Sequence, residues 1–202
     1  MSPLRRTTLL LGGCLVLGVG VALLLVADLG SDGFSTLVNG LTIATGLPFF
    51  VCNIIVSVSF LLIAALRRVI PGVGTLVQIL VVGLTVSVIF EVLSTPDSLP
   101  ARVGLVMLAM PVLAVGIAAY LGASLGAGPI EAAALAWDPP IPFRWSYSAV
   151  QLVGALTGWL LGGTVGLTTI IVIALLGPLV DLTSRVLRLD VHQRPVHHAP
   201  VG

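Results

Sequence analysis

Long apolar stretches alternate with short polar segments along the chain. Each of six stretches is close to the ~20 residues that an α-helix needs to cross the ~30 Å hydrocarbon core of a bilayer. The expected spans cover residues 8–27, 48–66, 73–93, 103–122, 145–161 and 165–187. The pattern therefore predicts an all-α membrane protein with about six transmembrane helices.

Composition points the same way. Apolar residues make up 57% of the chain and charged residues 8%, whereas a soluble domain carries about 25% charged residues. Such a chain cannot build a water-exposed surface, so the lipid bilayer is its expected surroundings. The net charge of +1 indicates no surface for nucleic acid. Cys14 and Cys52 fall inside expected spans and are interpreted as small core residues, not as a disulfide.

The first apolar stretch follows Arg5 and Arg6, as the core of a secretion signal would. However, its apolar run continues as far as Ala27. This length favours a first span or signal anchor over a peptide that is removed.

The two halves of the chain resemble each other. Residues 27–34 read ADLGSDGF and residues 123–130 read ASLGAGPI, an offset of 96 positions, and Gly20 and Gly116 precede them at the same offset. Farther along, GVGT at 72–75 is echoed by GLTT at 166–169, an offset of 94 positions. Each half holds three expected spans, an odd number, so the second half must enter the membrane from the opposite side.

The chain is therefore expected to consist of two inverted three-span repeats, each with a short non-spanning helix. The first repeat covers residues 8–93 and the second covers residues 103–187, with a polar linker at 94–102. Residues 1–7 form the N-terminus, and the polar, proline-bearing tail at 188–202 is expected to be disordered.

The arginines test this layout, because cytoplasmic loops collect basic residues. All nine basic residues are arginine, and only Arg102 falls outside if six spans start from the cytoplasm. The others fall inside: Arg5, Arg6, Arg67, Arg68, Arg144, Arg185, Arg188 and Arg194. We therefore expect a protein of the bacterial plasma membrane with both termini in the cytoplasm.

The segment between the first two spans predicts a short helix. Its apolar residues follow the helical spacing i, i+3, i+4 and i+7, at Phe34, Leu37, Val38 and Leu41. Asp32 is a suitable N-cap and Gly46 a suitable C-cap. The roughly 20 Å length of such a helix is too short to cross the membrane. Because its polar face carries no Lys or Arg, we favour a position within the protein over one along the membrane surface. Residues 130–137 predict a shorter counterpart.

These motifs together resemble those of a known family. The stretches are ADLGSDGF at 27–34, TGLPF at 45–49, PGVGT at 71–75, LGAGP at 125–129 and GGTVGLTT at 162–169. They are similar to the YczE/YyaS/YitT family of bacterial membrane proteins, from the first expected span to the sixth. The resemblance implies a bacterial multi-pass membrane architecture.

Four acids are candidates for ligand binding or ion coupling. Asp28, Asp32 and Glu131 stand at or near the beginnings of the short helices. They are either coupling carboxylates that face a central cavity or, as we favour for Asp32 and Glu131, helix caps. Asp28 has no obvious local role. Asp181 lies in the sixth expected span, where it either has a function or pairs with Arg185 four residues later.

Glycines at the turns are further candidates, because a residue without a side chain lets the backbone approach a ligand. These positions are Gly30, Gly33, Gly126 and Gly128. A separate ridge of small residues on the fifth expected span is typical of close helix packing. It consists of Gly154, Gly158 and Gly162.

Several amide side chains lie at membrane depth or in the first short helix. They are Asn39, Asn53, Gln78 and Gln151. Such side chains either line a polar path or, more often, hydrogen-bond neighbouring helices. Asn39 is included among the ligand candidates.

Motifs of enzymes are missing from the sequence. It contains neither a G-x-x-x-x-G-K-[ST] nucleotide loop nor an H-E-x-x-H zinc pair. The histidines all lie in the tail without a spaced ligand set, so no metal site and no cofactor are expected. With no histidine in the spans, a Ser/His/Asp triad cannot assemble. We do not expect an enzyme.

Two functions fit these observations. The first is a transporter or permease for a small solute or ion, in which Asp28, Asp181 and Asp32 act as binding or coupling acids. The alternative is a non-transporting partner that regulates or stabilises another membrane protein through its helix faces. A homo-oligomer is compatible with either function.

Overall fold

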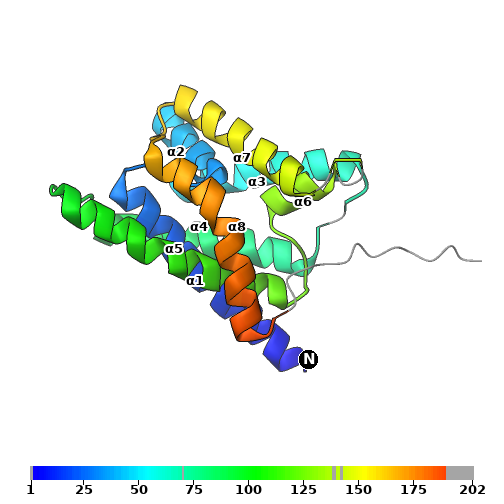
Figure 1. Ribbon diagram of the computed structural model, residues 1–202. Helices are drawn as coiled ribbons and strands as arrows, with labels where there is room; N and C mark the ends of the chain where they lie inside the picture. The colour runs from blue at the N-terminus through cyan, green and yellow to red at the C-terminus, as the bar shows by residue number, and fades with distance from the viewer. Residues whose placement is uncertain (1, 70, 138–139, 142, 190–202) are drawn as a thin grey trace, which may run out of the picture.

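The computed structural model describes residues 2–69, 71–137, 140–141 and 143–189. In this part of the chain all regular structure is helical, with eight helices and no strand (Figure 1). The helices are α1 (Pro3–Ala27), α2 (Gly33–Thr45), α3 (Phe49–Leu66), α4 (Val73–Val92), α5 (Leu99–Gly122), α6 (Pro129–Leu135), α7 (Phe143–Leu160) and α8 (Leu167–Leu187). The predicted all-α class is confirmed. The proposed disordered tail from residue 190 onward lies outside the described residues.

Five helices are long and apolar enough to cross a membrane: α1, α3, α4, α5 and α8. The chain is thus a multi-pass membrane protein. The fifth predicted span, at residues 145–161, corresponds to α7, which is not among these five helices. Its first half carries Ser146, Tyr147 and Gln151, and these polar side chains lower its hydropathy. The helix α5 begins at Leu99, before the predicted start of the span at residue 103, so Arg102 lies inside a helix.

The helices α1 and α5 pack against each other in antiparallel directions at the centre of the molecule (Figure 1). A Cβ atom built on Gly116 of α5 would lie 2.5 Å from the backbone nitrogen of Leu17. A Cβ atom built on Gly20 of α1 would lie 3.0 Å from the backbone nitrogen of Leu113. Only glycine allows the two backbones to come this close.

The remaining helices pack around this pair. On one side α4 packs against α1, and on the other α8 packs against α5. The short helix α2 packs against α7, while the short helix α6 packs against both α3 and α7. Figure 1 shows α2 and α7 side by side. Helices from the two halves of the chain are therefore interleaved rather than separate.

The short helix α2 has both predicted caps. Asp32 Oδ2 accepts a hydrogen bond from the backbone nitrogen of Ser35 at 3.0 Å, and Gly46 ends the helix at a φ of 70°. The first part of α2 is packed inside the molecule, where Ser31 and Thr36 hydrogen-bond and Val38 is fully buried. Its last residues, 43–45, are exposed. The second short helix, α6, has only 7 residues.

An arginine from each half binds the end of the first helix of the other half. Arg6, on α1, donates from Nε to Ala123 O at 2.9 Å and from Nη2 to Ser124 O at 2.6 Å. Arg102, on α5, donates from Nε to Ala27 O at 2.6 Å. The last carbonyl groups of a helix have no partner within the helix, so each arginine satisfies acceptors that would otherwise be exposed.

The contact of Arg102 also includes a carboxylate. Its Nη2 donates to Asp28 O and forms an ion pair with Asp28 Oδ2 at 3.2 Å. Thr164, in the loop before α8, donates to Asp28 Oδ1. Asp28 therefore has the local role that its sequence context did not suggest. It joins the end of α1 to α5 and to the loop between α7 and α8.

A methyl group at Gly116 should loosen the contact between α1 and α5. Overpacking a close helix contact costs about 1–3 kcal/mol, so Gly116→Ala should lower the midpoint of thermal unfolding in detergent. Gly104→Ala is the matched control, since it lies in the same helix and a Cβ there meets nothing within 4 Å. The control should be neutral or stabilising by about 0.5–1 kcal/mol. Equal midpoints for the two variants would contradict this account of the contact.

Candidate functional site

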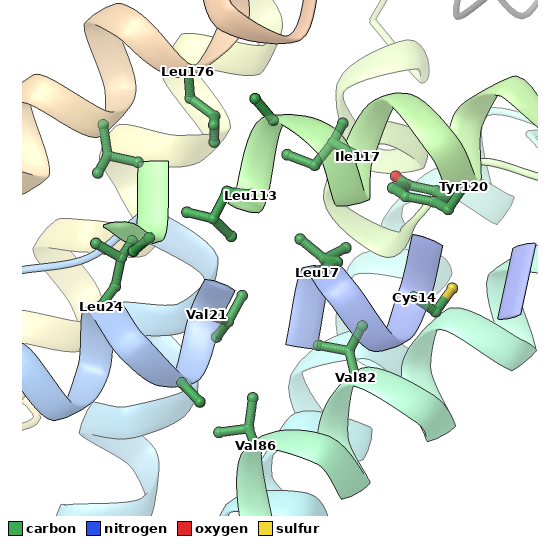
Figure 2. Packing of buried hydrophobic residues seen from close by; sticks show 14 of the residues in the cluster. Cys14, Leu17, Val21, Leu24, Val82, Val86, Leu113, Ile117, Tyr120 and Leu176 are labelled. Atoms are coloured by element: carbon green, nitrogen blue, oxygen red, sulfur yellow. The ribbon is translucent and has the colours of Figure 1, made fainter. Parts of the chain in front are cut away.

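A cavity of about 60 Å³ lies between the helices at the centre of the molecule. Its apolar wall comes mainly from the first helix of each half, with Leu17 and Val21 on α1 and Leu113 and Ile117 on α5. Leu176 of α8 adds to this wall. Figure 2 shows these side chains where α1, α5 and α8 meet.

The opposite wall of this central cavity is polar. Its polar residues come from α2 and its N-cap, α3, α4, α6 and α7: Asp32, Ser35, Asn53, Gln78, Glu131, Tyr147 and Gln151. The two carboxylates belong to different halves of the chain, because one precedes α2 and the other lies in the first turn of α6. The two short helices thus deliver one acid each to a single cavity.

Asp32 reaches the cavity while it caps α2. One of its oxygens holds the Ser35 backbone nitrogen, and its side chain lines the cavity. Burial raises the pKa of the Asp32 carboxyl, and the hydrogen bonds of the cap oppose that rise. Capping and facing the cavity are therefore compatible roles for this one residue.

Glu131 sits in a more unusual environment. Its Oε2 is buried without a hydrogen-bond partner among the described residues, and the same is true of the hydroxyl of Tyr120 on α5. Both atoms lie beside Gly128, where a built Cβ would come within 3.0 Å of the Tyr120 oxygen. Burial raises the pKa of Glu131 and the negative charge of Asp32 adds to that rise, while its own backbone N–H and the neighbouring Tyr120 hydroxyl oppose it. The net effect favours the neutral, protonated form of the Glu131 carboxyl.

Gln151 joins α7 to the first turn of α2. Its Oε1 accepts a hydrogen bond from the backbone nitrogen of Gly33 at 2.6 Å, and its Nε2 donates to the Tyr147 hydroxyl at 3.1 Å. Gly33 and Gly154 also bring the two backbones together, because a Cβ on Gly154 would lie 2.8 Å from Gly33 O. These contacts fix Asp32 relative to the α7 side of the cavity.

The other predicted ligand candidates do not line the central cavity. Asp28 is partly exposed in its contact with Arg102, and Asp181 is exposed on α8. No ion pair between Asp181 and Arg185 occurs in the described structure. Asn39 is half-buried on α2, away from the cavity lining. Of the four candidate acids, the structure brings together Asp32 and Glu131.

The candidate glycines serve contacts between segments of the protein. Gly30 and Gly126 adopt positive φ angles of 104° and 136°, which L-residues avoid. A Cβ on Gly126 would lie 2.8 Å from Thr75 Oγ1, and Gly30 faces Thr169 in the same way. Gly128 lies against Glu131. Of these three glycines, only Gly128 adjoins residues that line the cavity.

The glycine ridge of α7 packs within the molecule. Gly154 and Gly158 face the backbone of α2, and Gly162 lies near Ile43 of the same helix. The ridge therefore has the packing role that its spacing indicates. Its neighbour is a short helix of the same chain.

Two tyrosines near the carboxylates, Tyr120 and Tyr147, were missed by the sequence analysis. Tyr147 lies four residues before Gln151, and this i, i+4 spacing places both on one face of a helix. That spacing is a signal that could have identified Tyr147. Tyr120 meets Gly128 only through tertiary packing, so the sequence carried no signal for it.

The fold and the site define a class: a multi-pass membrane protein with a small cavity between its helices that is lined by both apolar residues and two carboxylates. Comparison with known families matches residues 4–185 to a family of unknown function, DUF6198. The chain belongs to this family. The more specific resemblance to YczE/YyaS/YitT proteins receives no support from the comparisons.

One curated relative is an uncharacterised protein of Haemophilus influenzae. It is 27% identical over 179 residues, an alignment that covers 88% of this chain and 82% of the relative. No solved structure matches.

Removing the amide of Gln151 should destabilise the α2–α7 contact. Gln151→Leu leaves the Gly33 N–H buried without an acceptor, a loss of about 1–3 kcal/mol. The control Gln78→Leu changes a cavity residue for which the described structure has no hydrogen bond. We expect a lower thermal midpoint in detergent for Gln151→Leu than for Gln78→Leu. The reverse order would contradict this role.

Proposed function

We propose that this protein is a transporter of a small solute or ion and that the central cavity is its binding site. One observation carries the proposal: two carboxylates, one from each half of a chain with few charges, line the same enclosed space. Ionisable groups inside a membrane protein are costly and usually serve transport or binding.

We further propose that the two halves are inverted three-span repeats, with α7 as a span in addition to the five apolar helices. The helix contacts support this, because exchanging the halves turns the α1–α4 contact into α5–α8 and the α2–α7 contact into α6–α3. The paired arginine contacts of Arg6 and Arg102 exchange in the same way. The polar residues of α7 face the cavity, which is the position that lets a polar helix span a membrane.

Inverted repeats suggest how the cavity would open. In such transporters, one bundle rocks against the other around a site near the middle of the membrane. Here the cavity lies where α1 and α5 cross the short helices. We propose that it opens alternately to the two membrane faces. Following the distribution of arginines, both termini would lie in the cytoplasm of a bacterial cell with the protein in its plasma membrane.

Within this proposal, Asp32 and Glu131 take over the role that the sequence suggested for Asp28 and Asp181. Asp28 already pairs with Arg102 at the end of α1, and Asp181 is exposed on α8. Asp32 and Glu131 are the acids that reach the cavity. They are the residues that transport should require.

The alternative function is a non-transporting membrane partner. A groove of about 620 Å³ favours it, because its lining is mostly apolar and includes Val103 and Met107 of α5 and Leu167 and Ile171 of α8. Against it, the glycine ridge that could have received another protein is covered by α2. If this alternative holds, no solute should give a flux in proteoliposomes, and a substitution in the groove, Met107→Trp, should abolish function in cells.

Transport should depend on the two cavity acids. We would record solute-induced currents from proteoliposomes on a solid-supported membrane across a panel of cations, anions and neutral solutes. Asp32→Asn and Glu131→Gln should abolish the current that the wild type gives, while Asp181→Asn should retain it. Asn also serves as an N-cap, so the first variant keeps the cap of α2. A current that survives both cavity substitutions would contradict the proposed site.

A further inference from the structure

The charges around the central cavity are all of one sign. Its described lining has two carboxylates and no arginine. The nearby basic side chains have other contacts: Arg6 and Arg102 bind helix ends, and Arg67 stacks over the Trp137 ring at 4.5 Å. An anionic ligand would meet repulsion here, whereas a cation would be attracted.

The groups left for a ligand are mainly acceptors. Asn53 already donates its amide nitrogen to Ile79 O at 2.9 Å, so it can offer its carbonyl oxygen. Glu131 Oε2 is buried and has no partner among the described residues. A ligand that carries N–H donors would satisfy both. Buried polar atoms without a partner in a native structure call for such an explanation.

The buried hydroxyl of Tyr120 has no hydrogen bond of ordinary geometry among the described residues, and it is a donor close to Glu131. Tyr120 is 1% exposed, and its oxygen lies beside Gly128 next to the Glu131 carboxylate. A buried hydroxyl at a carboxylate normally donates to it or to a group between them. Here it is poised to hold a ligand or a proton at Glu131.

The volume of the cavity and the aromatic residues of its wall limit which ligands can fit. An apolar cavity of about 150 Å³ holds one benzene molecule, so the cavity of about 60 Å³ has room for roughly two to four non-hydrogen atoms. Phe34 and Phe49 contribute aromatic rings to its wall. Aromatic rings attract cations, and a planar guanidinium also stacks on them while donating to carboxylates.

We propose that the central cavity binds a small organic cation with N–H donors, such as guanidinium or a short alkylammonium, in exchange for a proton. This proposal rests on the proposed transport function and specifies its substrate class. Before the cation binds, the carboxyl pair holds the proton. When the cation enters, the O–H bond of one carboxyl breaks, its electron pair stays on the carboxylate, and the proton leaves to water. The net charge of the site is unchanged.

The titratable groups that face this pair come from four elements. They are Asp32 at the start of α2, Glu131 on α6, Tyr120 on α5 and Tyr147 on α7. The described lining from α1, α3, α4 and α8 contributes none. Since tyrosine hydroxyls remain protonated at neutral pH, the exchanged proton belongs to the two carboxyls.

The test is calorimetric titration of the detergent-solubilised full chain with guanidinium chloride at neutral pH. Repeating it in buffers of different ionisation enthalpy measures the protons released per cation bound. We expect one cation per chain and release approaching one proton. Glu131→Gln and Asp32→Asn should each weaken binding by about tenfold or more, while the exposed control Asp181→Asn should bind as the wild type does. Size-exclusion profiles check that each variant is folded.

Two further salts test whether binding requires N–H donors and a positive charge. Tetramethylammonium has no N–H donor and should bind weakly, and sodium acetate should give no heat from either ion. Binding of acetate, binding of guanidinium without proton release, or unchanged affinity in Glu131→Gln would each overturn the proposal.

The calorimetric titration tests the substrate class, and the current recordings test the transport function, so each proposal can be contradicted separately. Guanidinium binding with proton release but no flux in proteoliposomes would leave the cation site standing and overturn the transport function. Flux of another solute that depends on Asp32 and Glu131, without guanidinium binding, would leave transport standing and overturn the substrate class.

Discussion

The close antiparallel contact between α1 and α5 is the interaction on which the rest of the structure depends. Gly116 lies against the backbone of Leu17, and Gly20 lies against Leu113. The backbones of α1 and α5, the first helix of each half, are therefore in close contact. In a membrane, apolar side chains gain little by leaving lipid, and close packing of small residues has to supply the attraction. The flanking helices α4 and α8 then pack on the two sides of this pair.

The central cavity lies beside this contact, in space that α1 and α5 do not fill. The short helices α2 and α6 pack against α7 and α3 of the opposite half, and their beginnings deliver Asp32 and Glu131 to the space beside α1 and α5. The glycines of α7 let α2 come close, and Gln151 binds the first turn of α2. Packing therefore holds two acids, which would be unfavourable alone in a membrane, at one polar site.

Much of the fold could be predicted because it depends on local sequence patterns. The apolar stretches located the five apolar spans, and Asp32 and Gly46 marked the ends of α2. The site was harder to predict, because its lining residues come from all eight helices of the described chain. The sequence made Asp28 a candidate for ligand binding, but in the folded chain its carboxylate is bound by Arg102 and Thr164. Conversely, the sequence favoured a helix-capping role for Glu131. Only the folded structure, in which Tyr120 packs beside Gly128, shows that the Glu131 carboxyl is buried in a cavity.

The central claim is that one cavity between the two halves opens to both faces of the membrane. The most direct measurement is the reactivity of a single cysteine at Gln78, which lines that cavity, after Cys14 and Cys52 are replaced by alanine. A membrane-impermeant thiol reagent would be applied separately to the inside and the outside of membrane vesicles. The account predicts labelling from both sides. Labelling from one side alone, or from neither, would contradict it.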